Sequence, residues 1–435
     1  MADYKIIHDT VHGSIKLEGL FLDLLETPEI QRLHGIHQLG LAYLVFPGAN
    51  HTRLEHSIGA CFVASRLAES LNLPEKEREL VMAAAMLHDL GHSPYSHTLE
   101  MAVLGKMLQD HMEITKDIIC GKRKILFEEG KEKDREFIPD LLKKYDLEPK
   151  DVADLIAGQK AEDQTPKIDD YSTFKNQLFL NDKKYLAHII HGSIDADQID
   201  YLLRDSHYTG VAHGTIDIDR LIQTAEIFNN DLVIHRRGVP AVEGMLVARA
   251  LMYTSVYFHK TVRIAELMLA RAVELLDEPL ENIHEMIDSE LMAKLKEHEG
   301  FQKDIAFMLK YRRLFKRILT ISKENASDKE VEVIQNLREP KNRRKAEKEI
   351  CNRAGIPEGY VIIDVPEKEL KITEPRIRAT NVKILDNKRL APLSKYSPLA
   401  RALEIREVYD WDIMISSAPQ YVDKVKKTAK KVLFA

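Results

Sequence analysis

The sequence predicts a mainly α-helical fold, with a helical core over residues 1–355 and a smaller α+β unit over residues 356–435. Two observations support this division. Through most of the first part, apolar residues recur at the three- and four-residue spacing of amphipathic helices. After Pro357 the pattern changes to short β-like runs, and a basic amphipathic stretch follows them. We therefore expect a large helical body followed by a small unit of mixed structure.

The bulk composition is that of an ordinary soluble globular protein. The chain has 435 residues, 44% of them hydrophobic and 30% charged, which is enough for a large core and a second unit. The longest apolar runs, such as residues 80–87, are too short to span a bilayer, and the first residues lack a signal-peptide pattern. The three cysteines form no CxxC motif, which excludes a cysteine metal site and favours a cytoplasmic location.

The first 120 residues are expected to form a hairpin followed by helices. Two β-like runs at residues 4–7 and 14–17 predict the hairpin. Thr27 and Pro28 suit an N-cap and a first helical position, and the helix that they begin is expected to continue through Ile36 and end at Gly40. Further helices are expected over residues 56–71, 74–87 and 98–120.

The rest of the chain follows from the same patterns. Residues 121–185 are expected to form a charged helical insertion in the core, with residues 131–136 on the solvated surface. Helical spacing resumes at Tyr185 and continues over residues 194–210, 241–278 and 285–353. In the C-terminal unit, residues 361–365 and 411–415 are predicted to be strands, and residues 420–434 a closing helix.

One short segment, Met86–His97, concentrates the residues that could carry chemistry. Three histidines and an aspartate lie within ten residues, and neutral imidazole and carboxylate are ligands for divalent transition metals. Adjacent His88 and Asp89 cannot share a helix face, so both can reach one ion only where a helix ends. Gly91 and Pro94 are expected to supply that end. The alternative, a surface histidine cluster, is less consistent with the matching segments upstream at 53–56 and downstream at 195–197.

Taken together, His56, the His88–Asp89 doublet and Asp197 match the H…HD…D pattern of the HD-domain phosphohydrolases. Over roughly residues 1 to 265 the chain resembles the deoxynucleoside triphosphate (dNTP) triphosphohydrolases of that superfamily. The runs that carry this resemblance are Gln31-Arg32-Leu33, Gln38-Leu39-Gly40, Phe46-Pro47-Gly48-Ala49, Arg53-Leu54-Glu55-His56-Ser57, His88-Asp89-Leu90-Gly91-His92, Asp195-Ala196-Asp197-Gln198-Ile199-Asp200-Tyr201 and Leu203-Arg204-Asp205.

The resemblance implies a metal centre and a catalytic pair. The implied ligands of one divalent ion are His56, His88, Asp89 and Asp197. Iron, manganese, zinc and nickel all suit that donor set, and magnesium is also expected to enter with the nucleotide. The implied catalytic residues are His92, which would protonate the leaving 5′-oxygen, His111, and Glu100, which stands where the family usually has aspartate. The alternative for His111 is a solvent-facing helix residue.

The same resemblance implies a substrate pocket for a deoxynucleotide. The implied phosphate contacts are Arg53, Arg249 and Lys260. The implied contacts to the sugar and base are Gln38, Leu39, His97, Tyr201, Asp205, Tyr253 and Tyr257, with Leu39 crowding a ribose 2′-hydroxyl. For the three tyrosines, ordinary helix packing is the alternative interpretation.

Two departures from the family pattern are visible. Gln198 stands where vertebrate members have a phosphate-binding lysine, so one positive charge toward a triphosphate is missing. At the positions that hold an activating guanine nucleotide in some members, this chain has His8, Glu26, Gln31 and His34. Because imidazole cannot make the bidentate phosphate contact of arginine, we expect no activation by GTP.

The function expected from the sequence is hydrolysis of dNTPs to deoxynucleoside and inorganic triphosphate by a homodimer or homotetramer. Two alternatives stay open: an HD-domain phosphohydrolase for a monophosphate, cyclic dinucleotide or guanosine alarmone, and a nucleotide-sensing scaffold. The net charge of −6 makes nucleic acid an unlikely partner, and nothing in the sequence predicts a membrane partner.

Overall fold

The computed structural model describes most of the chain, and all structural statements below concern the described residues. These are residues 4–96, 98–99, 111–125, 136–157, 183–278, 280, 282–322, 326–365, 382–404 and 413–434. The proposed site residues His97 and Glu100 lie outside them, as do residues 131–135 of the expected surface segment.

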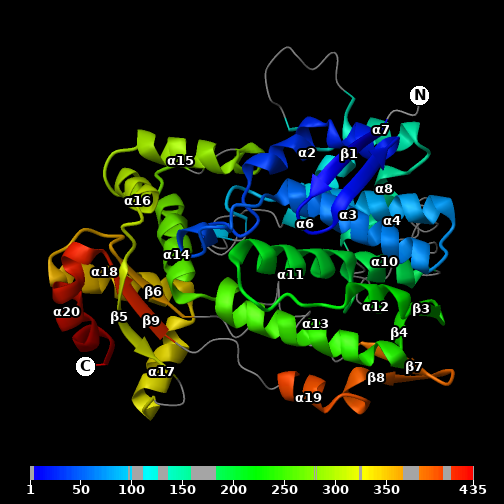
Figure 1. Cartoon of the computed structure of the whole chain (residues 1–435). Helices are drawn as coiled ribbons and strands as arrows, with labels where there is room; N and C mark the ends of the chain where they lie inside the picture. The colour runs from blue at the N-terminus through cyan, green and yellow to red at the C-terminus, as the bar shows by residue number, and fades with distance from the viewer. Residues whose placement is uncertain are drawn as a thin grey trace, which may run out of the picture.

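The described part is mainly helical, as the sequence predicts, with three small sheets (Figure 1). The helices are α1 Leu20–Leu25, α2 Pro28–Arg32, α3 Arg53–Ser70, α4 Glu75–Leu87, α6 His111–Ile119, α7 Ile138–Lys144, α8 Pro149–Ala157, α10 Lys184–His191, α11 Ala196–Thr209, α12 Ile218–Gln223, α13 Val239–Met252, α14 Lys260–Glu274, α15 Asp288–Glu297, α16 Phe301–Lys310, α17 Asp328–Leu337, α18 Pro340–Ala354, α19 Pro398–Glu404 and α20 Val422–Phe434. The strands are β1 Tyr4–Asp9, β2 Gly13–Glu18, β3 Ala225–Phe228, β4 Asp231–His235, β5 Lys316–Ile321, β6 Val361–Asp364, β7 Lys383–Asp386, β8 Arg389–Pro392 and β9 Ile413–Ser417.

The centre of the helical body is formed by α3, which packs against α4 on one side and α11 on the other (Figure 1). Small residues such as Ala60, Ala64 and Ala68 are fully buried on α3, and they let its neighbours approach closely. Leucines and isoleucines of the surrounding helices complete this core. The core holds α3, α4 and α11 in a fixed relation, and the metal-ligand candidates lie on or just after these three helices.

The predicted N-terminal hairpin is confirmed, because β1 and β2 pair antiparallel with Tyr4 opposite Glu18. Its tip is ordered by Asp9, whose carboxylate accepts hydrogen bonds from the backbone N–H groups of Val11 and His12. Gly13 has a φ of +77°, a conformation that glycine adopts without strain. This local geometry turns His12 inward, where its side chain is only 3% exposed.

The helix expected from Thr27 to Gly40 is much shorter than predicted. It ends at Arg32, a 3₁₀ turn covers Leu33–Gly35, and Ile36 is extended. The 3₁₀ turn lies close to another segment, because a Cβ on Gly35 would lie 2.7 Å from the side chain of Ile287. The apolar residues at helical spacing, Ile30, Leu33 and Ile36, are nevertheless buried. The spacing therefore predicted correctly which residues are buried, but not where the helix ends.

Residues 121–185 contain two helices where the structure describes them, α7 and α8, and the leucines and isoleucines of both are buried in the main core. One further expectation needs correction. The stretch 285–353 is not one run of helix, since β5 interrupts it at residues 316–321. The three apolar residues of this short strand do not alternate, so they give no clear strand pattern between two amphipathic helices.

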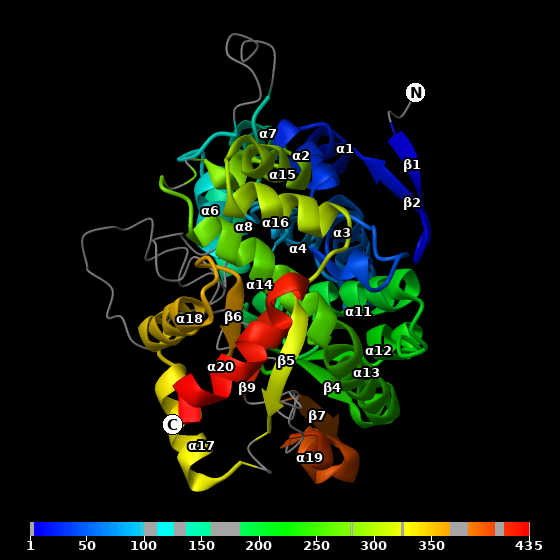
Figure 2. The same cartoon turned by 90° about the vertical axis from the view of Figure 1, so that its left-hand side faces the viewer.

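The strands of the C-terminal part belong to two different sheets. β9 lies between β5 and β6 and pairs antiparallel with both, and α20 covers this sheet (Figure 2). β7 instead pairs parallel with β4 of the helical body, and β8 extends that sheet. The boundary at residue 356 stays a prediction. Strands pair across it twice: β5, before the boundary, pairs with β9, and β7, after it, pairs with β4. No helix in the described ranges is long and apolar enough to cross a membrane.

Candidate metal centre

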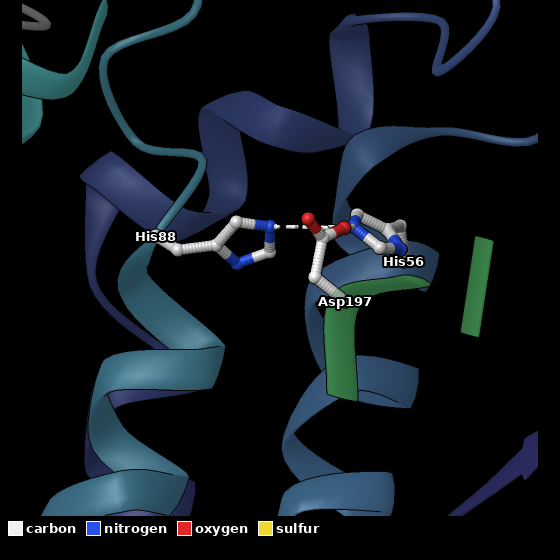
Figure 3. Close-up of side chains that lie close together, drawn as sticks. All are labelled: His56, His88 and Asp197. Atoms are coloured by element: carbon white, nitrogen blue, oxygen red, sulfur yellow. Dashed lines mark hydrogen bonds and ion pairs between the residues drawn. The ribbon is translucent and has the colours of Figure 1, made fainter. Parts of the chain in front are cut away.

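Three side chains from three helices converge on one point near the middle of the body (Figure 3). His56 of α3 and His88 at the end of α4 place their Nε2 atoms 3.3 Å apart. Asp197 of α11 lies between the two rings, with its Oδ1 3.1 Å from Nε2 of His56 and 3.7 Å from Nε2 of His88. Two imidazole nitrogens and a carboxylate oxygen at such short separations are a donor set that could hold a divalent ion.

The other nitrogen of each ring shows that the Nε2 atoms are prepared for a metal. Nδ1 of His56 donates to the carboxylate of Asp200 at 2.7 Å, and Nδ1 of His88 donates to the backbone carbonyl of Ala85 at 2.8 Å. A ring that donates through Nδ1 leaves Nε2 as the atom that can bind a metal. Both Nε2 atoms lie at the same site, where a divalent ion can take the place of a proton, so the residues present fit a divalent metal.

Asp89, the fourth predicted ligand, lies beside the other three. Its two oxygens are 3.2 Å from Nε2 of His88 and 3.8 Å from Nε2 of His56. Burial raises the pKa of Asp89, but the neighbouring Arg53, His88 and His92 outweigh burial and hold the pKa well below its ordinary value. Arg53 also donates to Asp89 directly, so this carboxylate is ionised and already oriented.

The doublet is placed as the sequence predicts, at the C-terminal end of a helix, but Gly91 has a different role. The helix α4 ends at Leu87, before the doublet, with His88 as its C-cap. A Cβ on Gly91 would lie 2.1 Å from the carbonyl oxygen of His111, and the Gly91 N–H donates to Oγ1 of Thr115. The absence of a side chain at Gly91 therefore lets α6, which carries His111, pack against the segment after the doublet.

A buried carboxylate under the metal site, Asp200, was not identified from the sequence. Its two oxygens accept from His56, from Nε2 of His12 at 2.6 Å, and from both Nε and Nη2 of Arg204 at 2.9 Å. Burial opposes the charge, but Arg204 and the two histidines lower the pKa of Asp200 far below its ordinary value. The i, i+4 spacing of Asp200 and Arg204 on α11 could have indicated their ion pair from the sequence. The contact of Asp200 with His12 could not have been predicted, because the two residues are far apart in the chain.

Replacing Asp200 with Asn is expected to weaken metal binding about 10- to 100-fold, because an amide cannot accept from His56 and Arg204 on both sides. The affinity for Mn²⁺ or Co²⁺ would be measured by calorimetric titration of the variant and the wild type. Asp217→Asn, at the exposed N-terminus of α12, is the matched control and should leave the affinity unchanged. An unchanged affinity in the Asp200 variant would contradict the orienting role.

The predicted catalytic histidines lie together at the edge of the metal centre. The rings of His92 and His111 stack with centroids 4.1 Å apart and an angle of 16° between their planes. Nε2 of His92 is 3.3 Å from Oδ1 of Asp89. Burial, with help from Arg53 and His111, lowers the pKa of His92 to about 4, so His92 is neutral at ordinary pH before substrate arrives.

On the other side of the centre, predicted sugar-binding residues form a connected wall. Asp205 accepts from the Tyr257 hydroxyl at 2.6 Å and from Nε2 of His51 at 2.8 Å. The Tyr257 ring contacts those of Tyr201 and Tyr253, at centroid distances of 6.2 and 5.1 Å. Residues 253–257 form a π-helical turn between α13 and α14, a rare conformation that is frequent at functional sites. His51, which holds Asp205, was not singled out from the sequence.

The remaining predicted binding residues lie on several elements. Arg249 is buried, donates to Oε1 of Gln198 at 3.1 Å and lies over the Tyr253 ring. The Gln198 amide nitrogen in turn donates to Asp195 and to the Gly192 carbonyl, so Gln198 is fixed in place. Gln38 and Leu39 follow the 3₁₀ turn after α2, and Lys260 begins α14.

Comparison with known proteins identifies the family. A family model described as HD domain matches residues 53–205, and one described as HD associated region matches residues 216–434. This chain belongs to the HD-domain family. The first match begins at Arg53 and ends at Asp205, so it contains all four metal-ligand candidates of this HD-domain protein.

Individual relatives agree with this placement. The chain is 32% identical to MJ1154 of Methanocaldococcus jannaschii, over 98% of this chain and 82% of that protein. It is 29% identical to the deoxynucleoside triphosphate triphosphohydrolase SAMHD1 of Bos taurus over 64% of this chain, and it spans about half the length of that relative. A crystal structure of a hypothetical protein from Aquifex aeolicus matches 98% of this chain and all of the other, with a TM-score of 0.71 and 28% identity.

Proposed function

We propose that this HD-domain protein hydrolyses dNTPs to deoxynucleoside and inorganic triphosphate. The observation that carries the proposal is the convergence of the His56 and His88 Nε2 atoms with Asp197, beside a stacked histidine pair and a tyrosine–aspartate wall. The metal centre suits a phosphohydrolase, and the wall suits a sugar with a free 3′-hydroxyl. Relatives named as dNTP triphosphohydrolases support the choice of substrate.

In the proposed reaction, water attacks the α-phosphorus and the bond from this phosphorus to the 5′-oxygen breaks. A divalent ion held by His56, His88, Asp89 and Asp197 supplies polarisation of the phosphate oxygens when it is bound. His92 and His111 form the proton pathway: the pair takes up the proton released by the attacking water and delivers one to the 5′-oxygen. Arg53, held by Ser96 at 2.7 Å, stabilises the negative charge on the α-phosphate.

The proposed sugar specificity comes from the wall around Asp205. The Asp205 side chain can accept a hydrogen bond from a 3′-hydroxyl, and Tyr257 stays protonated because burial and the Asp205 carboxylate raise the pKa of Tyr257 well above the ordinary value. Leu39, which packs against the main core, would oppose a ribose 2′-hydroxyl. Arg249 and Lys260 are the proposed partners of the outer phosphates.

The test is product analysis. Purified protein would be incubated with each dNTP and each NTP in the presence of Mn²⁺ or Mg²⁺, with and without GTP, and the products separated by ion-exchange chromatography. The proposal expects deoxynucleoside and intact triphosphate from dNTPs, little turnover of NTPs, and no requirement for GTP. Diphosphate or orthophosphate as the first product would contradict it.

A second candidate is an HD-domain phosphohydrolase for a nucleotide with fewer phosphates. Gln198 favours it, because this neutral side chain is engaged by Asp195, Gly192 and Arg249 and supplies no charge toward a triphosphate. The same chromatography distinguishes the two candidates when monophosphates and cyclic dinucleotides are added to the panel. A homodimer or homotetramer and a cytoplasmic location stay predictions.

A further inference from the structure

A carboxylate of the HD-associated region, Asp288, joins two segments that border the proposed substrate pocket. Asp288 begins α15 and is 4% exposed. Its Oδ2 accepts from the backbone N–H of His37 at 3.0 Å and from Nδ1 of the same residue at 2.6 Å. Its Oδ1 accepts from the backbone N–H of Tyr95 at 2.7 Å. One buried side chain therefore satisfies three donors on two separate segments.

The first of these segments carries the proposed sugar contacts. His37 directly precedes Gln38 and Leu39, so the position of the His37 backbone sets the positions of both. The approach of α15 to this segment is close, since Gly35 has no room for a Cβ against Ile287. The residue before α15, Ile287, therefore lies against the 3₁₀ turn that follows α2.

The second segment follows His92 and is conformationally strained. Tyr95 and Ser96 are consecutive non-glycine residues in the left-handed region, with φ of 55° and 53°. Each such residue costs on the order of 1–3 kcal/mol and persists only when its surroundings impose it. Asp288 supplies one such constraint at Tyr95, and the Ser96 hydroxyl supplies others by donating to the His37 carbonyl and accepting from Arg53.

From these contacts we propose that Asp288 is a positioning residue for sugar selectivity. By holding the His37 backbone and the Tyr95 backbone at a fixed separation, Asp288 keeps Leu39 close enough to the metal centre to exclude a ribose. The contact also gives the HD-associated region a role in the chemistry of the HD domain, since Asp288 and Tyr95 belong to different matched regions. The selectivity part of this inference rests on the function proposed above.

The test replaces Asp288 with Asn, which has one acceptor oxygen for donors that approach from two sides. We expect kcat/KM for dNTPs to fall about 10- to 100-fold, as for other small displacements in active sites, and the preference for dNTP over NTP to fall at least about tenfold. The affinity for Co²⁺ should stay within about twofold, because Asp288 does not contact the ligands. His37→Ala keeps the backbone contact with Asp288 and should give a smaller loss of preference.

The matched control is Glu347→Gln, a buried carboxylate of the same region that accepts from Arg271 and from the backbone N–H of Ile363. This variant should lose stability but keep the preference for dNTP over NTP, which separates positioning from general destabilisation. If the wild type prefers dNTP over NTP and the Asp288 variant keeps the same preference, the inference is overturned but the proposed function is not. A wild type that turns over neither dNTP nor NTP would overturn the proposed function, and the inference with it.

Discussion

Replacing Asp197 with Ala is expected to abolish both metal binding and hydrolysis. Asp197 is the only one of the four ligand candidates that comes from α11, and its carboxylate lies between the two imidazole rings. Without it, the two imidazole rings and Asp89, already paired with Arg53, are left to hold the ion. Because metal assistance is worth several kcal/mol of activation free energy, the rate should fall at least about 1000-fold.

The measurements for this variant are a Co²⁺ or Mn²⁺ titration and the dNTP hydrolysis rate under saturating metal. Asp219→Ala, which removes an exposed carboxylate paired with Arg66, is the control and should match the wild type in both. Retention of wild-type metal affinity by the Asp197 variant would show that the ion, if any, is held elsewhere.

Gly59→Ala is expected to be strongly destabilising, although it adds only one methyl group. A Cβ at this position of α3 would lie 1.9 Å from Oδ1 of Asp200 and 2.3 Å from Nη2 of Arg204. The pair cannot move aside without losing its contacts with His12, His56 and Asp9. Breaking a buried ion pair costs about 3–5 kcal/mol, so we expect a loss of that size in the free energy of unfolding.

Chemical denaturation of the Gly59 variant and the wild type measures this loss. The matched control is Gly244→Ala on α13, where a Cβ would meet nothing within 4 Å and alanine should stabilise the helix by up to about 1 kcal/mol. Opposite signs for the same substitution at two helical glycines would confirm that Gly59 makes room for Asp200. Equal effects would contradict it.

The sequence predicted the parts of this fold that depend on local spacing. The helices α3, α4 and α20 and the N-terminal hairpin are confirmed because their apolar residues repeat regularly and their ends carry turn or cap residues. The ligand candidates were found for a similar reason, since His88 and Asp89 are adjacent and the H…HD…D order is preserved along the chain. In the structure, Asp89 lies beside the cluster of His56, His88 and Asp197.

The residues that support the site were missed, because their partners are distant in sequence. His12 and Asp200 are 188 residues apart, and His37 and Asp288 are 251 residues apart. A lone histidine in a hairpin turn or a lone aspartate at a helix start has many ordinary explanations, and only the tertiary structure selects among them. The early end of α2 was missed as well, because the apolar spacing continues through Ile36 although the helix ends at Arg32.

The most direct test of the central claim is hydrolysis of a dNTP in ¹⁸O-water with mass analysis of both products. Attack at the α-phosphorus forms a new phosphorus–oxygen bond to water and leaves the 5′-oxygen on the sugar. The account therefore predicts triphosphate carrying one ¹⁸O and an unlabelled deoxynucleoside, with both absent in the Asp197→Ala variant. Label in the deoxynucleoside, or label in a released diphosphate or orthophosphate, would contradict it.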